Sequence, residues 1–192
     1  MPRHDEPVDH HGAVRHGVYP GSFDPPTLAH LAVADAARRR HSLDRVVWTL
    51  SRHPLGKEQG RTTVEERRTV LDQVATDHAW LEVNVVDARL VADLADGYDV
   101  VVMGADKWHQ LHDPSFYEDE TAMAKALSRL PTCAVAPRDG LEIPPEALLA
   151  VPRWVARQSS TAAAAAEPWT MLSAARSFGL WDGPDQTGNR SA

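Results

Sequence analysis

The sequence predicts a single-domain α/β protein built on a doubly wound, Rossmann-like sheet of five parallel strands. Short runs of β-branched and aromatic residues alternate with helical segments from residue 14 onward, an order that favours a parallel sheet. The run from Val100 to Met103 is continuously apolar and is closed by a glycine, which is typical of a central strand buried on both faces. A length of 192 residues suits one domain with a sizeable core.

Each predicted element has its own local signal. Strands are expected where β-branched or aromatic runs occur, at 14–19, 46–50, 80–86, 99–104 and 132–136. The first helix, 28–40, is alanine-rich and ends in arginines that suit its negative dipole end. The second, 63–76, opens with the capping box formed by Thr63 and Glu66. Further helices are expected at 88–95, at 118–130 and, after Pro168, up to residue 178.

Three other segments complete the predicted organisation. Residues 153–156 are predicted to form an edge strand. Residues 1–12 and 183–192 are polar and are expected to be a flexible arm and a flexible tail. The domain is therefore predicted to span residues 13–182.

Composition disfavours several classes of protein. The formal net charge is -7, and no basic block occurs beyond residues 38–40, so a general nucleic-acid or membrane-surface binder is disfavoured. Cys133 is the only cysteine, which excludes a disulfide framework and a cysteine-rich zinc site. His109 and His112 lie three apart, but no third ligand follows at a useful spacing, so no metal site is predicted. No export signal or membrane-spanning run is found, so a cytoplasmic protein is expected, with a homo-oligomer left open.

The chemistry is predicted to centre on residues 17–30, Gly-Val-Tyr-Pro-Gly-Ser-Phe-Asp-Pro-Pro-Thr-Leu-Ala-His. This stretch is typical of a strand, a tight turn and a helix start, which together gather backbone N–H groups at a positive helix end. Gly21 lets a phosphate approach the main chain without a Cβ in the way. Thr27 and His30, three residues apart, are expected on one face of the first helical turn, beside that phosphate.

These residues resemble the signature of the nucleotidyltransferases with a T/H-x-G-H motif, among them phosphopantetheine adenylyltransferase and the nicotinate or nicotinamide mononucleotide adenylyltransferases. The turn, with Thr27 in place of the first histidine, is closest to the phosphopantetheine branch, and Ala29 stands where the family has glycine. The resemblance implies a catalytic role for His30 and Thr27. It also implies nucleotide contacts from the turn residues Gly21, Ser22, Phe23 and Asp24.

Two further segments extend the resemblance toward the acceptor. The loop before Thr63 resembles the family's lysine-bearing substrate loop, which makes Lys57 the implied phosphate contact, in catalysis and in acceptor binding; a solvated loop lysine is the alternative. Gly104 and Asp106 resemble the Gly-x-Asp of the mononucleotide branch, where the acid lies near the ATP ribose or the second substrate. Asp106 is otherwise a plain helix N-terminal acid. Trp108 is a candidate for stacking on the acceptor ring, although tryptophan is more often core.

A last segment resembles the family's phosphate-gripping motif, Ile-Ser-Ser-Thr-x-x-Arg. Ser159, Ser160 and Thr161 are the implied nucleotide contacts, while Ala164 occupies the position of the arginine. An arginine makes charge-assisted bonds to a triphosphate that alanine cannot replace. Arg157 is the nearby residue that could substitute for it.

The resemblance implies an adenylyltransferase that uses ATP, bound with Mg²⁺, and a small phosphate-bearing acceptor. Nicotinate or nicotinamide mononucleotide, in NAD biosynthesis, is the leading expectation and phosphopantetheine the next; residues 87–93 do not match the threonine-bearing segment of the nicotinate enzymes. Ala29 and Ala164 leave open a nucleotide-binding protein of the same fold that has lost catalysis. A redox dinucleotide domain is disfavoured because no Gly-x-Gly-x-x-Gly follows the first strand.

Overall fold

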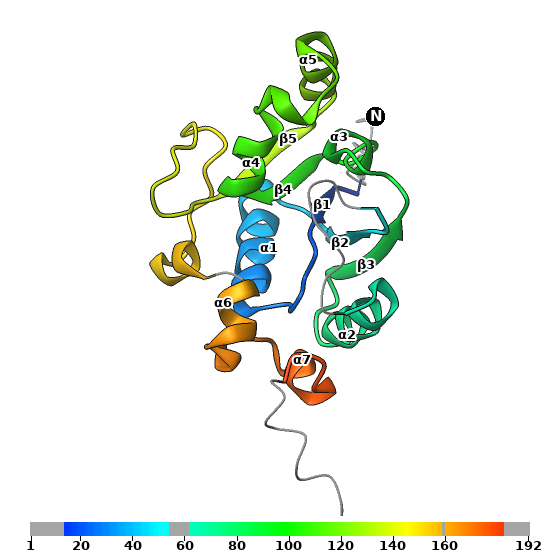
Figure 1. Cartoon of the computed structure of the whole chain (residues 1–192), viewed down its shortest axis with the longest axis vertical. Helices are drawn as coiled ribbons and strands as arrows, with labels where there is room; N and C mark the ends of the chain where they lie inside the picture. The colour runs from blue at the N-terminus through cyan, green and yellow to red at the C-terminus, as the bar shows by residue number, and fades with distance from the viewer. Residues whose placement is uncertain (1–13, 54–61, 159, 183–192) are drawn as a thin grey trace, which may run out of the picture.

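A single parallel sheet organises the chain in the computed structural model, which describes residues 14–53, 62–158 and 160–182 (Figure 1). Its five strands are arranged in the order β3-β2-β1-β4-β5. They are β1 (His16–Pro20), β2 (Arg45–Ser51), β3 (Leu81–Val86), β4 (Val100–Gly104) and β5 (Thr132–Ala136). The predicted doubly wound sheet is confirmed, and each strand lies within two residues of its expected ends.

Helices cover both faces of this sheet. One face carries α1 (Leu28–His41) and α2 (Val64–Thr76), and the other carries α3 (Val91–Leu94), α4 (Ala105–Leu111) and α5 (Glu120–Ser128). Strand β4 shows how the core divides, because Val100 and Val102 pack on the first side and Val101 and Met103 on the second. The buried apolar run in the sequence thus serves two core layers.

The C-terminal part of the chain packs beside the first face. It consists of α6 (Ser160–Ala165), the 3-10 helix η3 (Pro168–Thr170) and α7 (Ser173–Phe178), and α7 lies against α2 (Figure 1). The predicted helix up to residue 178 is therefore interrupted between residues 170 and 173. Its last turn ends at Gly179, which adopts a left-handed conformation with φ of 66°.

The prediction of an edge strand at 153–156 is wrong. These residues form the 3-10 helix η2 (Arg153–Arg157), which begins after Pro152. The edge of β5 is already occupied, because the backbone of Val135 bonds to Ala147 and Leu149 at 2.8 Å each. Residues 153–156 consequently have no strand edge to join.

The predicted arm and tail lie outside the described residues, and the domain limits remain a prediction. Of the helices that the structure describes, none has the length and apolar character needed to cross a membrane.

Candidate phosphate-binding site

A cavity of about 500 Å³ opens at the carboxyl edge of the sheet. The strand order reverses between the paired strands β1 and β4, so the segments that follow these strands diverge to opposite faces and leave a crevice between them. Residues of the stretch 17–30, on which the chemistry was predicted to centre, line this cavity. Of the predicted site residues, the cavity brings together Gly21, Ser22, Thr27, His30, Gly104, Asp106, Ser160 and Thr161.

The other predicted residues lie elsewhere. Phe23 is fully buried beneath the turn, and Asp24 bonds to residues behind it, so neither lines the cavity. Trp108 packs with the second core layer, its ring 4.4 Å from that of His112, and it does not line the cavity. Lys57 and Ser159 fall outside the described residues. Their roles remain predictions.

Thr27 and His30 are joined at the start of α1. The backbone N–H of Thr27 donates to Nδ1 of His30 at 3.0 Å, and the Thr27 hydroxyl lies 2.8 Å from the same nitrogen. Because a backbone N–H can only donate, Nδ1 is the acceptor and the proton of the neutral ring lies on Nε2. His30 lines the cavity, and Nε2–H is the donor group of its ring.

The N-terminus of α1 adds backbone donors beside this ring. The helix has 14 residues, and its first turn contains no acidic side chain that would offset the positive end of the dipole. Thr27, its N-cap, is 1% exposed and lines the cavity. An anion in the cavity would meet both the helix end and the imidazole N–H.

The shape of the turn depends on the packing of Gly21 against Phe23, which the sequence did not predict. Phe23 has a left-handed backbone, with φ of 46°, and its ring stacks on Trp48 at 4.9 Å and packs against His30 at 5.0 Å. A Cβ on Gly21 would come within 2.8 Å of the Phe23 ring. Glycine is therefore required at position 21 for the packing of Phe23, as well as for access to the backbone.

Residues far along the chain hold the turn from behind. Buried Arg67, on α2, donates to the carbonyl oxygen of Ser22 at 2.7 Å. The carboxylate of Asp24 accepts hydrogen bonds from Thr62 at 3.0 Å and from the indole N–H of Trp181 at 2.5 Å. Burial lowers the pKa of Arg67, and the charge of Asp24 opposes that shift.

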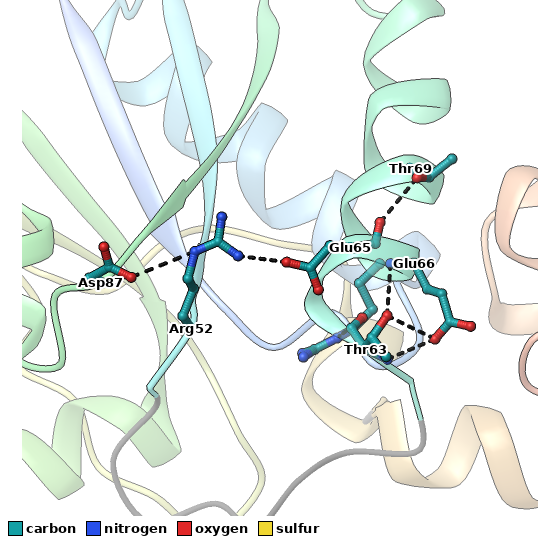
Figure 2. A network of polar contacts seen from close by, with 7 residues as sticks. Arg52, Thr63, Glu65, Glu66, Thr69 and Asp87 are labelled. Carbon is teal, nitrogen blue, oxygen red and sulfur yellow. Dashed lines mark hydrogen bonds and ion pairs between the residues drawn. The ribbon is translucent and has the colours of Figure 1, made fainter.

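A polar network fixes the neighbouring ends of β2 and β3 (Figure 2). Arg52 pairs with Glu65 in the first turn of α2 at 2.6 Å and with Asp87 after β3 at 3.6 Å. The backbone N–H of Thr63 donates to Glu66 at 2.8 Å and the N–H of Glu66 donates to the Thr63 hydroxyl at 3.1 Å, which confirms the predicted capping box. Backbone hydrogen bonding and Arg52 lower the pKa of Glu65.

Electrostatically, the cavity is the opposite of the chain as a whole. Four lysine or arginine side chains and a single acid, Asp106, are among the described residues that line it, although the net charge is -7. The four cations are Arg67, Arg89, Lys107 and Arg138. Such a local excess of positive charge attracts phosphorylated ligands.

Arg138 was not predicted, and it brings a guanidinium to the start of the second motif, at Gln158. Its guanidinium donates to the carbonyl oxygen of Gln158 at 3.3 Å and pairs with Asp106 at the same distance. Arg157, the expected substitute, is 81% exposed and pairs with Asp139, and it does not line the cavity. The position of Arg138 in the sequence could have identified it as a site residue, because it comes just after β5, at the same edge of the sheet as the other site residues.

Fold and site together define an α/β protein with a cationic cavity at the switch point of its sheet. Residues 18–158 match the model of the family described as Cytidylyltransferase-like, and the chain belongs to this family.

Curated relatives carry two kinds of name. A probable nicotinate-nucleotide adenylyltransferase of Bordetella pertussis is 30% identical over 155 residues, which are 76% of this chain and 74% of that protein. A phosphopantetheine adenylyltransferase of Natranaerobius thermophilus is 32% identical over 108 residues, 56% of this chain and 60% of the relative. A probable nicotinate-nucleotide adenylyltransferase of Oceanobacillus iheyensis is 25% identical over 116 residues, 50% of this chain and 61% of the relative. The chain thus spans less than two thirds of the last two proteins.

A solved structure shares the fold. Plasmodium falciparum nicotinic acid mononucleotide adenylyltransferase complexed with NaAD is similar with a TM-score of 0.61, covering 88% of this chain and 98% of that one. The identity is 14%, so this likeness supports the architecture alone.

Proposed function

We propose that this protein transfers the adenylyl group of ATP to the phosphate of nicotinate or nicotinamide mononucleotide and releases pyrophosphate, a step of NAD biosynthesis. The observation that carries the proposal is the convergence of the His30 N–H, the α1 N-terminus and cationic side chains on one cavity. The names of the relatives from Bordetella and Oceanobacillus supply the acceptor. We assign the reaction to residues 13–182 and, from the single cysteine, to the cytoplasm.

In this reaction a phosphate oxygen of the acceptor bonds to the α-phosphorus of ATP, and the bond from that phosphorus to the bridging oxygen of pyrophosphate breaks. The acceptor phosphate is already a nucleophile, so the protein needs no base and mainly aligns and neutralises charge. The Nε2–H of His30 donates to the oxygens on which charge develops. Thr27 sets the direction of that donor through its contacts with Nδ1.

Arg138 and the first turn of α6, which begins with Ser160 and Thr161, are proposed to bind the leaving pyrophosphate. Arg138 adjoins the start of this turn through Gln158. Lys57, Ser159 and the backbone at Gly21 are proposed to complete the phosphate contacts. Asp106 is proposed to bind the ribose, whereas Trp108 packs with the second core layer outside the cavity and is assigned no role at the acceptor.

Mg²⁺ is proposed to arrive on the triphosphate. Within the described part of the chain, no group of three or more His, Cys, Asp or Glu side chains is placed to hold a metal, and Asp106 is the one cavity acid. The residues therefore fit a cation held chiefly by phosphate oxygens. When bound, it neutralises charge on the leaving group.

Phosphopantetheine is the second candidate acceptor. It is favoured by the Natranaerobius relative and by Thr27 at the first motif position. A binding protein without catalysis is the third reading, because the methyl of Ala29 lines the cavity where the family has glycine.

One experiment separates these functions. The purified chain is incubated with Mg²⁺, with ATP or CTP, and with each of the three acceptors, and pyrophosphate is followed. Release with a mononucleotide, and a fall in kcat of about 100-fold or more in His30→Ala, are expected because an oriented donor to developing charge is lost. His78→Ala is the control, since His78 precedes β3 and therefore lies near the amino ends of the strands, whereas the cavity lies at their carboxyl ends. Release with phosphopantetheine alone would favour the second candidate, and ATP binding without release would favour the third.

A further inference from the structure

Arg89 reaches the cavity from a backbone segment that is fixed on both sides. The segment 87–90 links β3 to α3 at the carboxyl edge of the sheet. Its start is held by the ion pair between Asp87 and Arg52 (Figure 2) and by the Ser51 hydroxyl, which donates to the carbonyl oxygen of Ala88 at 2.7 Å. Its end is held because Val91 and Leu94, in α3, are buried. The base of the Arg89 side chain is therefore well positioned.

The guanidinium of Arg89 differs from the other cations of the cavity. Arg67 bonds to two backbone carbonyls, Lys107 to Gln110 and Arg138 to Asp106. Arg89 is exposed to the cavity, and within residues 14–53, 62–158 and 160–182 its guanidinium has no hydrogen bond or ion pair. Its planar set of donors is accordingly available to a ligand.

The wall beside Arg89 is apolar and aromatic. Leu90, Val91, Leu111 and Tyr117 line the cavity together, and the same four also border a smaller adjoining hollow, so they are neighbours. The Tyr117 hydroxyl donates to the carbonyl oxygen of Leu111 at 2.9 Å, which engages its polar group within the protein. An apolar wall of this kind suits a flat ring, and Arg89, which precedes Leu90 in the chain, is the cavity-lining cation next to it in sequence.

We propose that Arg89 binds a carboxylate carried by the aromatic ring of the acceptor, and thereby makes the chain prefer nicotinate mononucleotide over nicotinamide mononucleotide. A guanidinium pairs with a carboxylate through two parallel, charge-assisted hydrogen bonds, whereas a neutral carboxamide offers one acceptor and adds donors that face the guanidinium. The inference rests on the proposed function for the identity of the acceptors. It adds the residue that chooses between them.

The test measures binding and turnover separately on the full chain. Isothermal titration calorimetry gives the Kd of each mononucleotide, and pyrophosphate release with Mg²⁺ and ATP gives kcat/KM, for the wild type, Arg89→Met and Arg89→Lys. Arg39→Met is the matched control, because Arg39 is an exposed arginine of α1 that pairs with Asp35 and does not line the cavity. Circular dichroism checks that each variant is folded.

The wild type is expected to bind nicotinate mononucleotide at least 10-fold more tightly than the amide. Arg89→Met is expected to weaken binding of the carboxylate by about 10- to 100-fold and that of the amide by less than 3-fold, with Arg89→Lys between the two. Equal losses for both acceptors would overturn the proposal, because they would place Arg89 on the phosphate that the two share. A wild type without preference, a preference that survives in Arg89→Met, or binding of neither acceptor would overturn it as well. Preferential binding without pyrophosphate release would refute the proposed function and leave the role of Arg89 supported.

Discussion

Replacing Trp181 with phenylalanine should destabilise the protein and weaken nucleotide binding together. Trp181 is 3% exposed, and its indole N–H donates to the Asp24 carboxylate at 2.5 Å. A hydrogen bond to a charged group contributes about 1.5–3 kcal/mol, and the smaller ring leaves some unfilled volume. We expect the free energy of unfolding to fall by about 2–3 kcal/mol in urea. Because Asp24 belongs to the turn that is proposed to bind phosphate, the KM for ATP should also rise.

The control for this variant is Trp154→Phe. Trp154 lies on η2, is 44% exposed and should change stability by less than about 0.5 kcal/mol. A double-mutant cycle with Asp24→Asn should give a coupling free energy of about 1 kcal/mol or more, since the two side chains touch. A Trp181→Phe protein as stable as Trp154→Phe, or a cycle with no coupling, would refute the reasoning.

Three more substitutions test separate features of the site. Gly21→Ala should lower the free energy of unfolding by about 1–3 kcal/mol, because the added Cβ overpacks against the Phe23 ring. Gly104→Ala is the control and should lower it much less, because its added Cβ meets nothing within 4 Å. Equal losses of stability in urea would contradict this reasoning. Arg138→Met should raise the KM for ATP by about 10-fold or more, while Arg157→Met should leave that KM nearly unchanged. A larger rise in KM for Arg157→Met than for Arg138→Met would instead make Arg157 the phosphate contact. Glu65 has a lowered pKa in the folded protein, so its stabilisation is present above its unfolded pKa and is lost as pH falls through its folded pKa. Glu65→Gln should therefore reduce thermal stability near pH 7 and have little effect near pH 2, and a difference independent of pH would exclude the charge as the cause.

Local signals predicted the fold well because each element is encoded within its own residues. The buried strand β4 follows from an apolar run, and the start of α2 follows from Thr63 and Glu66, whose reciprocal bonds involve no distant residue. The prediction of an edge strand at 153–156 was wrong because the edge of β5 is already occupied by Leu148, which pairs with Val135. Propensity cannot reveal that a partner is already taken.

In the candidate site, too, contacts between residues close in sequence could be predicted, whereas contacts between distant residues could not. Thr27 and His30 are three residues apart, so their contact could be predicted from helical spacing alone. The contacts that support them could not, since Arg67 reaches Ser22 across 45 positions and Trp181 reaches Asp24 across 157. These pairings are products of tertiary packing, and no periodicity in the sequence marks them.

The two departures from the family pattern acquire a different weight once the cavity is known. Ala164 removes an arginine from the second motif, but Arg138 brings a guanidinium to the start of the same turn from the end of β5. A triphosphate responds to the position of a charge, whichever segment supplies it. For Ala29, which lines the cavity, the described residues offer no comparable compensation, because a charge placed elsewhere does not remove the volume of a methyl group. Any loss of catalysis should therefore come from the shape of the cavity at Ala29 before it comes from missing charge at Ala164.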